Sequence, residues 1–463
     1  RFLALRWNGL TNAGAYIEAA GAIPILFSLK LAPTVYDIPA VSVASSLVLT
    51  NTAPTVPYRG AGRPEGVYII ERLIDQAARE LGIDRLEIRR KNFIRPDQFP
   101  YKTATGVEYD SGDYQRSLAE ALELSHYDDL IKQRDEARAR GELCGVGVST
   151  FVEPSGGAGF ESSTVRIERT GEITVLTGSS SHGQGHETVF AQVAAEMLRV
   201  SMDHVAVRHG DTLAIQQGVG TFGSRSAIMG GGALSLAIDK VVAKAKRFAA
   251  NLLEAAPEDI VQADGGFAVA GTPDKKITWR QVAGAAYGRP LPGIEPGLQE
   301  TVFFDPGREA WGFGSHVALV RIDKETGEAK LDKLVLVDDC GVIINPMIVE
   351  GQIHGGVAQG LGEAFREQMI YGDDGGVLTG SLVNYAVPHA ENMPPLVLGE
   401  TVTPNPFHPF GVKGVGEAGT NGAPPCVANA VMDALAPLGI AHIDMPYSAP
   451  KLWAAIQAAR SKS

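Results

Sequence analysis

The stretch "TVRIERTGEITVLTG" (residues 164–178) decides the fold class of this chain. Apolar and polar residues alternate on both sides of its central "RTG", a pattern typical of two strands joined as a hairpin. A second stretch, "HVALVRIDKETGEAKLDKLVLVDD" (316–339), predicts another hairpin around "KETGE". Antiparallel hairpins mixed with helices, without a strict βαβ alternation, predict an α+β fold of mixed sheets with packed helices.

Helices are expected on both sides of these hairpins. Apolar residues at helical spacing in "EGVYIIERLIDQAAREL" (65–81) predict a helix that ends at Gly82. We find no repeat of fixed period. The other elements expected are two helices over 113–140, a helix over 187–199, a strand over 205–211, a helix over about 227–255, a helix after Asn345-Pro346, and a last clear helix from about Pro424.

Composition limits the possible partners. Of 463 residues, 41 are Lys or Arg and 53 are Asp or Glu, which gives a formal net charge of -12. An acidic chain of this size is a poor candidate for binding nucleic acid or an anionic membrane. We expect no signal peptide and no apolar run long enough to span a bilayer. The length predicts roughly two to four domains.

The three cysteines, Cys144, Cys340 and Cys426, are far apart in the sequence. No CxxC motif is present, so cysteine spacing builds neither a zinc ribbon nor an iron–sulfur cluster. A sparse, odd number of cysteines fits a reducing compartment better than a disulfide scaffold. We therefore expect a cytoplasmic protein.

Glycine is abundant, with 54 residues, and it gathers in short clusters. Where such a cluster precedes a helix, free backbone N–H groups favour anions and the glycines let a phosphate approach the backbone. Several such sites suggest an extended polyanionic ligand such as a dinucleotide, although neither a Walker A motif nor a GxGxxG in a βαβ unit is present. The clusters are "PYRGAGRPE" (57–65), "GSSSHGQGHETVFAQ" (178–192), "GVGTFGSRSA" (218–227) and "FGVKGVGEAGTNGAPP" (410–425).

Taken one at a time, the polar residues in these stretches have simpler explanations. Glu417 is either a helix N-cap or a proton acceptor. Arg59 fits a surface or salt-bridging arginine, and Gln359 fits a buried amide with satisfied hydrogen bonds. His182 and His186 are four residues apart, but no HExxH motif follows, so we do not expect a metal site there.

Taken together, the motifs resemble those of the molybdenum hydroxylases. The resemblance is to the molybdopterin-binding large subunit of the xanthine dehydrogenase, aldehyde oxidase and carbon monoxide dehydrogenase family, and to its form II branch. It covers nearly the whole chain. The motifs that carry it, in their family order, are "YRGAGRPE", "GQGHETVFAQ", "GTFGSRSA", "INP…EGQIHGGVAQGLGEA" and "GVKGVGEAGT".

The resemblance implies a molybdenum-dependent oxidoreductase that inserts a water-derived oxygen into an electrophilic C–H bond of an N-heterocycle or aldehyde. Glu417 is then the general base, Arg59 stabilises negative charge on the substrate, and Gln359 hydrogen-bonds near the cofactor. The cofactor is molybdenum with molybdopterin cytosine dinucleotide, whose dithiolene holds the metal, so no side chain ligates it directly. The cofactor-binding residues implied are Gly183, Gln184, Gly185, His186, Thr221, Gly223, Ser224, Arg225, Ser226, Gln359, Lys413, Gly414 and Gly416.

The chain departs from the family pattern at two places. True carbon monoxide dehydrogenases carry a copper-binding cysteine where this chain has Gly60, so we expect no copper and no oxidation of carbon monoxide. Only 58 residues precede Arg59. We therefore expect residues 1–105 to be the C-terminal part of a first molybdopterin-binding domain, with another chain supplying the rest, and residues 106–463 to form a second domain of two intertwined α+β subdomains.

The resemblance also implies a [2Fe–2S] small subunit and an FAD-binding medium subunit that receive the electrons. Other hypotheses stay open. One is a reductive or xanthine-like member with another substrate, for which Phe151 and Glu153 are candidate discriminating residues. Another is a non-catalytic scaffold, and a third is a phosphate- or nucleotide-binding module without metal. The joint presence of Gln184, Gln359 and Glu417 argues against the scaffold.

Overall fold

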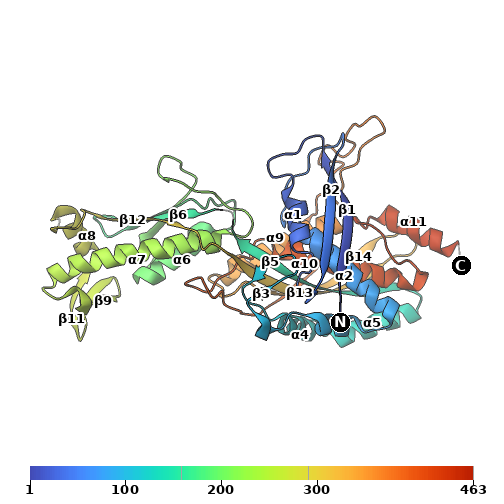
Figure 1. Ribbon diagram of the computed structural model, residues 1–463, viewed down its shortest axis with the longest axis horizontal. Coiled ribbons are helices and arrows are strands. Elements are labelled where there is room, and N and C mark those ends of the chain that lie inside the picture. The colour runs from blue at the N-terminus through green and yellow to red at the C-terminus, as the bar shows by residue number, and fades with distance from the viewer. Residues whose placement is uncertain (158, 290, 462–463) are drawn as a thin grey trace.

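The computed structural model describes residues 1–157, 159–289 and 291–461. The chain forms two lobes (Figure 1). It enters the smaller lobe after β5 (Leu143–Gly156) and returns through β13 (Glu309–Ile322), and these two strands pair along their whole length. Sheets and helices are mixed without a βαβ repeat, which confirms the α+β prediction. The predicted domain boundary between residues 105 and 106 stays a prediction.

The larger lobe is built on a four-stranded sheet in the order β15 (Leu396–Glu400), β14 (Ala329–Asp339), β13 and β5. Helix α10 (Ala418–Leu435) lies directly on β5. Glycine makes this close approach possible, because a Cβ at Gly145 would stand 2.1 Å from the Ala430 carbonyl oxygen. The other helices of this lobe include α2 (Arg63–Leu81), α3 (Arg85–Asn92), α4 (Tyr114–Ser125), α5 (Tyr127–Ala139), α9 (Pro346–Phe365) and α11 (Ala449–Arg460).

The prediction of the last helix is wrong in two respects. Helix α10 begins at Ala418, six residues before Pro424, and α11 follows it. Pro424 and Pro425 lie inside α10, although proline there removes backbone donors at a cost of about 3 kcal/mol or more. Every residue of α10 is buried, and the helix packs on β5, β13, α9 and α2. This packing offsets the cost of the two prolines. In the sequence alone, the same prolines indicate a helix boundary.

The smaller lobe holds a second four-stranded sheet, ordered β12 (Leu298–Phe304), β6 (Glu161–Ile167), β7 (Ile173–Thr177) and β8 (Val205–Arg208). The predicted hairpin is present as β6 and β7. The predicted helices are α6 (His186–Leu198) and α7 (Ser226–Leu252). The lobe also contains β9 (Ile260–Ala263), β10 (Gly266–Val269), β11 (Thr272–Thr278) and α8 (Trp279–Gly288).

Helix α7 is the one helix of the described residues that is long and apolar enough to cross a membrane. However, 67% of its most apolar window is buried inside the protein. Its neighbours in the core of the smaller lobe include Phe190, Val175 and Leu298. An apolar helix that is mostly buried in this way is the core helix of a lobe and needs no membrane.

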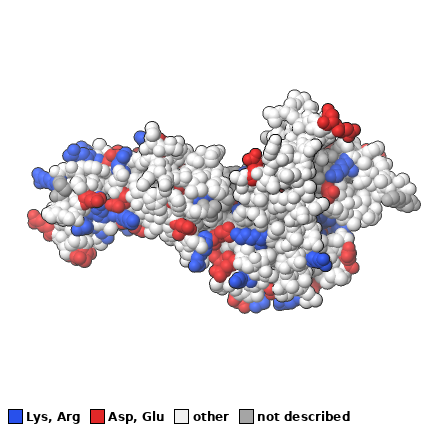
Figure 2. Space-filling view, turned by 45° about the horizontal axis from the view of Figure 1, so that its top comes forward, with Lys and Arg blue, Asp and Glu red and all other residues white. Residues whose placement is uncertain are grey.

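A two-stranded parallel sheet projects from the larger lobe beside α1 (Ile23–Lys30) (Figure 1). Its strands are β1 (Leu5–Gly14) and β2 (Val41–Leu49), and exposed positions alternate with half-buried ones along both. Figure 2 shows mostly uncharged atoms over the projecting part, while charged side chains gather at the far end of the smaller lobe. The short strands β3 (Tyr101–Lys102) and β4 (Glu108–Tyr109) complete the fold.

Candidate functional site

A cavity of about 680 Å³ lies where the two lobes meet. The larger lobe lines it with the loop before α2, the start of α9 and the loop before α10. The smaller lobe lines it with the N-terminal ends of α6 and α7. All the predicted site residues line it except Gln359 and Gly185. Those in its wall are Arg59, Gly183, Gln184, His186, Thr221, Gly223, Ser224, Arg225, Ser226, Lys413, Gly414, Gly416 and Glu417.

Glu417 occupies the N-cap position of α10, but its side chain does not cap the helix. One carboxylate oxygen accepts a hydrogen bond from the Gly60 N–H (3.0 Å), and the other contacts the Ser224 hydroxyl (2.9 Å). The residue is only 8% exposed. Of the two roles that the sequence left open, the structure does not support the N-cap, because this carboxylate bonds to residues of the cavity wall and not to the helix N–H groups. The role of proton acceptor stays a prediction.

Arg63 is a residue that the sequence analysis missed. Its buried guanidinium lies 3.3 Å from the Glu417 carboxylate and donates to the carbonyl oxygens of Gly60 (2.9 Å) and Pro154 (3.0 Å). It places a positive charge beside the one carboxylate of the loop. Arg63 is part of "YRGAGRPE", but it is also the first residue of α2, where a charged side chain is usually solvated. Its position in the sequence therefore does not indicate a role in the site, whereas its burial beside Glu417 does.

Arg59 is held by neutral partners. Its guanidinium donates to the Gly416 carbonyl (2.5 Å), to Gln359 Oε1 (3.1 Å) and to Gln352 Oε1 (2.9 Å). Among the described residues no carboxylate forms an ion pair with it. Its charge is therefore oriented but not neutralised, which suits an anionic group in the cavity. Gln359 thus contacts Arg59 and does not line the cavity itself, and Gln352 is a second partner of Arg59 that the sequence analysis missed.

Two helix N-termini of the smaller lobe lie at the cavity. Their backbone donors show whether the site fits a polyanionic cofactor. Helix α6 follows Gly185, which has a φ of 73°, and α7 follows Arg225. Neither helix has a side-chain hydrogen bond at its N-cap, so its first N–H groups are open to an anion. Gly183 has a φ of 106°, and a Cβ there would meet open space. These donors fit the phosphates of a dinucleotide.

The polar side chains of these two loops mostly bond within the loops. Gln184 Oε1 accepts a hydrogen bond from the His182 N–H, and the Thr221 and Ser226 hydroxyls are 2.9 Å apart. His186 is buried and stacks on Phe190, and burial lowers the pKa of His186. Within the described residues no group of three or more His, Cys, Asp or Glu side chains is arranged to hold a metal ion.

Two predicted cofactor-binding residues place their charged groups against residues that do not line the cavity. The Arg225 guanidinium forms a fully buried ion pair with Glu161 (2.7 Å). The Lys413 ammonium lies over the Phe313 ring, 5.3 Å from its centre, and burial lowers the pKa of this lysine. We infer that both residues shape the wall of the cavity through their backbone and their packing.

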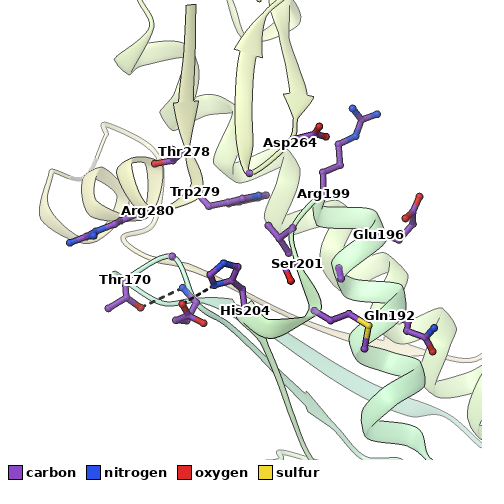
Figure 3. A pocket seen from close by; sticks show the side chains of 16 residues that line it. Thr170, Gln192, Glu196, Arg199, Ser201, His204, Asp264, Thr278, Trp279 and Arg280 are labelled. Atoms are coloured by element: carbon purple, nitrogen blue, oxygen red, sulfur yellow. Dashed lines mark hydrogen bonds and ion pairs between the residues drawn. The ribbon is translucent and has the colours of Figure 1, made fainter.

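A second cavity, of about 980 Å³, opens in the smaller lobe (Figure 3). Trp279, Arg199 and Glu196 line it, and His204 contacts Glu172 at 3.0 Å. Its charged groups are of both signs and half exposed, and none of the predicted site residues lines it. We therefore place the candidate site in the cavity between the lobes, where Arg59, Glu417 and both helix N-termini converge.

Comparison with known proteins identifies the relatives of this chain. The family described as "Molybdopterin cofactor-binding domain" matches residues 1–93 and 120–394. The carbon monoxide dehydrogenase large chain of Hydrogenophaga pseudoflava is 39% identical over 99% of this chain and 59% of its own length. The nicotine 6-hydroxylase large subunit of Paenarthrobacter nicotinovorans is 37% identical over 98% of this chain and 57% of its own length.

A solved structure, quinoline 2-oxidoreductase from Pseudomonas putida 86, superposes with a TM-score of 0.93 at 38% identity. The alignment covers 99% of this chain and 60% of that chain. The chain thus spans less than two thirds of the relatives that it matches. The chain belongs to the molybdopterin-binding large-subunit family of molybdenum-dependent oxidoreductases, the family that its glycine-rich motifs predicted.

Proposed function

We propose that this chain is the molybdopterin-binding catalytic subunit of a molybdenum hydroxylase. The reaction inserts a water-derived oxygen into an electrophilic C–H bond of an N-heterocycle or an aldehyde. The observation that carries the proposal is the buried Glu417 carboxylate. It is fixed at the cavity wall by the Gly60 N–H, Arg63 and Ser224, and it does not cap its helix.

The cofactor supplies the oxidising metal and the site of oxygen transfer when it is bound. The N-terminal ends of α6 and α7 would hold its phosphates, because their first N–H groups are uncapped. Two such ends on one cavity suit an extended polyanion, which supports molybdopterin cytosine dinucleotide. Side chains do not ligate the metal in this proposal.

Glu417 acts as the general base and accepts the proton that is released when the oxygen nucleophile forms. Arg59 is bound to the carbonyl oxygen of Gly416, the residue next to Glu417, and stabilises the negative charge that develops on the substrate. Its hydrogen bonds to Gln352 and Gln359 fix the orientation of its guanidinium (2.9 and 3.1 Å).

The proposed substrate class follows from two relatives and from one residue. Nicotine and quinoline, named in the relatives' descriptions, are N-heteroaromatic compounds. Gly60 offers no thiol to a copper ion, and Cys340, the cysteine in the cavity wall, is buried beside Asp339 and Asp338, which raises the pKa of its thiol. Both observations favour hydroxylation of a heterocycle, with no copper, over the oxidation of carbon monoxide.

We also propose partner chains, namely a [2Fe–2S] small subunit, an FAD-binding medium subunit, and further polypeptide that completes the molybdopterin-binding region. Parallel sheets are normally buried on both faces, yet β1 and β2 stand alone with open edges. The three cysteines are free, which supports the cytoplasm as the compartment. The proposed domains remain residues 1–105 and 106–463.

A non-catalytic scaffold and a metal-free phosphate- or nucleotide-binding module are the alternatives. Elemental analysis of the purified, matured complex, combined with nucleotide release, separates them from the proposal. We expect molybdenum, released CMP and no copper, and then turnover of an N-heterocycle in a substrate screen. A complex without molybdenum and without a cytosine nucleotide would contradict the proposal and return Glu417 to a structural role.

A further inference from the structure

The Ser224 hydroxyl touches two carboxyl groups at once. Its oxygen hydrogen-bonds to Glu153 Oε1 and lies 2.9 Å from Glu417 Oε2. A serine hydroxyl carries one hydrogen, and an ionised carboxylate can only accept. Both contacts can be hydrogen bonds only if one of the two carboxyl groups is protonated and donates to the serine oxygen. The geometry therefore requires a proton on Glu153 or on Glu417.

The surroundings decide which of the two carries it. Arg63 lies 3.3 Å from Glu417, and the Gly60 N–H donates to the same carboxylate. Glu153, in contrast, is 1% exposed and forms no ion pair among the described residues. Its Oε1 accepts a weak hydrogen bond from the Glu417 N–H (3.3 Å), and its Oε2 has no partner in the described structure. An unpaired buried carboxyl group favours its neutral form.

Burial and the charge of Glu417 favour the neutral form of Glu153, while the nearby cations oppose it. Burial is the largest effect and, together with the negative charge of Glu417, raises the pKa of Glu153 to about 8, although Arg63 opposes the shift. Arg59 is the other cation nearby. Ser224 itself has a φ of 53°, which is uncommon for a residue with a side chain and is compatible with a constrained functional position.

We propose that Glu153 is a positioning residue that holds a proton and donates it to Ser224, so that the serine hydroxyl donates to Glu417. The glutamate pair then shares a single proton, and this proton resides on Glu153 in the resting state. Glu417 stays ionised and oriented as the base. The role of Glu417 as a base rests on the proposed function, but the position of the proton does not.

The chain of hydrogen bonds has a consequence for pH dependence. When Glu153 loses its proton, Ser224 can donate to only one carboxylate, and a second negative charge stands beside Glu417. The ordered state is therefore present at pH values below about 8 and is lost as the pH rises through that value. Turnover should fall on the alkaline side for this reason.

The first test is an infrared difference spectrum of the intact complex, wild type minus Glu153→Gln. We expect the carbonyl band of a protonated carboxylic acid at neutral pH, lost as the pH is raised past about 8. A difference spectrum is needed because burial also raises the pKa of Glu363 to about 8. Glu258→Gln, the same change at an exposed residue of the smaller lobe, should give no such band.

The second test compares two substitutions in turnover. Glu153→Leu removes the donor to Ser224 and should lower kcat about 10-fold or more. Glu153→Gln should recover most of that loss, because its amide N–H can donate to Ser224, and it should abolish the alkaline decline. Cofactor content, measured alongside, identifies a variant that has lost its fold.

Two results would overturn the inference. One is an unchanged carboxylic-acid region in the spectrum of Glu153→Gln, and the other is a wild-type pH profile in that variant. The infrared measurement requires no turnover. It therefore tests the proton on Glu153 even if the proposed reaction is wrong. A band assigned to Glu153 in a complex without molybdenum would support the assignment and contradict only the proposed reaction.

Discussion

At the scale of single residues, the site depends on a carboxylate whose sequence position suggests a different role. Glu417 stands where an N-cap would stand, and its backbone does begin α10. Its carboxylate nevertheless contacts residues from two other loops, at Gly60 and Ser224. An N-cap contributes to helix stability, whereas a base contributes to the rate of the chemical step. Substitution can therefore separate the two roles.

We predict that Glu417→Gln retains molybdenum and lowers turnover by a factor of about 10² to 10⁴, the usual contribution of a general base. The amide keeps the size of the side chain but cannot accept a proton. Molybdenum content and kcat, measured on the same preparation of the complex, check this. Glu295→Gln, the same change at an exposed residue, should affect neither quantity. Normal turnover in Glu417→Gln would show that Glu417 is not the general base.

At the scale of elements, the cavity depends on how closely the loop before α10 approaches the loop before α7. The Gly414 N–H donates to Ser155 Oγ (3.0 Å), and a Cβ at Gly414 would stand 2.1 Å from the Ser224 carbonyl oxygen. Gly414 and Ser224 are 190 residues apart in the sequence. Their contact sets the position of Ser224 relative to Glu417.

We predict that Gly414→Ala displaces Ser224, destabilises the fold by about 1–3 kcal/mol and lowers the molybdenum content. The clash involves backbone atoms, which cannot turn aside as a side chain can. The thermal midpoint and the ratio of molybdenum to protein are the measurements. Gly284→Ala is the matched control, because a Cβ on that face of α8 meets open space. Full metal loading in Gly414→Ala would contradict the proposed packing role.

At the scale of the whole molecule, the projecting sheet and the residues before it expose large apolar side chains to solvent. Leu3 and Leu10 are 79% and 81% exposed, and Leu49 at the end of β2 is 59% exposed. A two-stranded sheet is marginally stable by itself in water. We attribute this exposure to a surface that further polypeptide of the assembled enzyme covers.

We predict that Leu10→Lys lowers the yield of assembled complex, because it places a charge where the covering chain would bury an apolar side chain. Leu252→Lys, the same change at an exposed position on the smaller lobe, should leave the yield unchanged. Size-exclusion chromatography of co-expressed subunits measures both. Equal yields of the two variants would show that the projecting sheet is not an assembly surface.

Apolar periodicity is visible in the sequence where burial alternates along an element. The hairpin at 164–178 and helix α2 alternate in burial, so their apolar periodicity is visible in the sequence. Strand β5 was not predicted. Almost every residue of it is buried, since α10, α5 and α2 all pack against it, so no alternation remains to be detected. Helix α10 is also fully buried, and its prediction placed the start six residues too late, near Pro424.

The sequence by itself determined the family, the glycine-rich loops and the candidate base, because these depend on residue types at fixed local spacing. The tertiary structure decided that Arg63 faces Glu417 and that Arg225 and Lys413 direct their charges elsewhere. It also brought Glu153 to Ser224. A charged side chain has the same sequence signature whether it is solvated or buried, and its partners here lie on distant segments. Only packing, which removes water from these groups, sets their charge and their role.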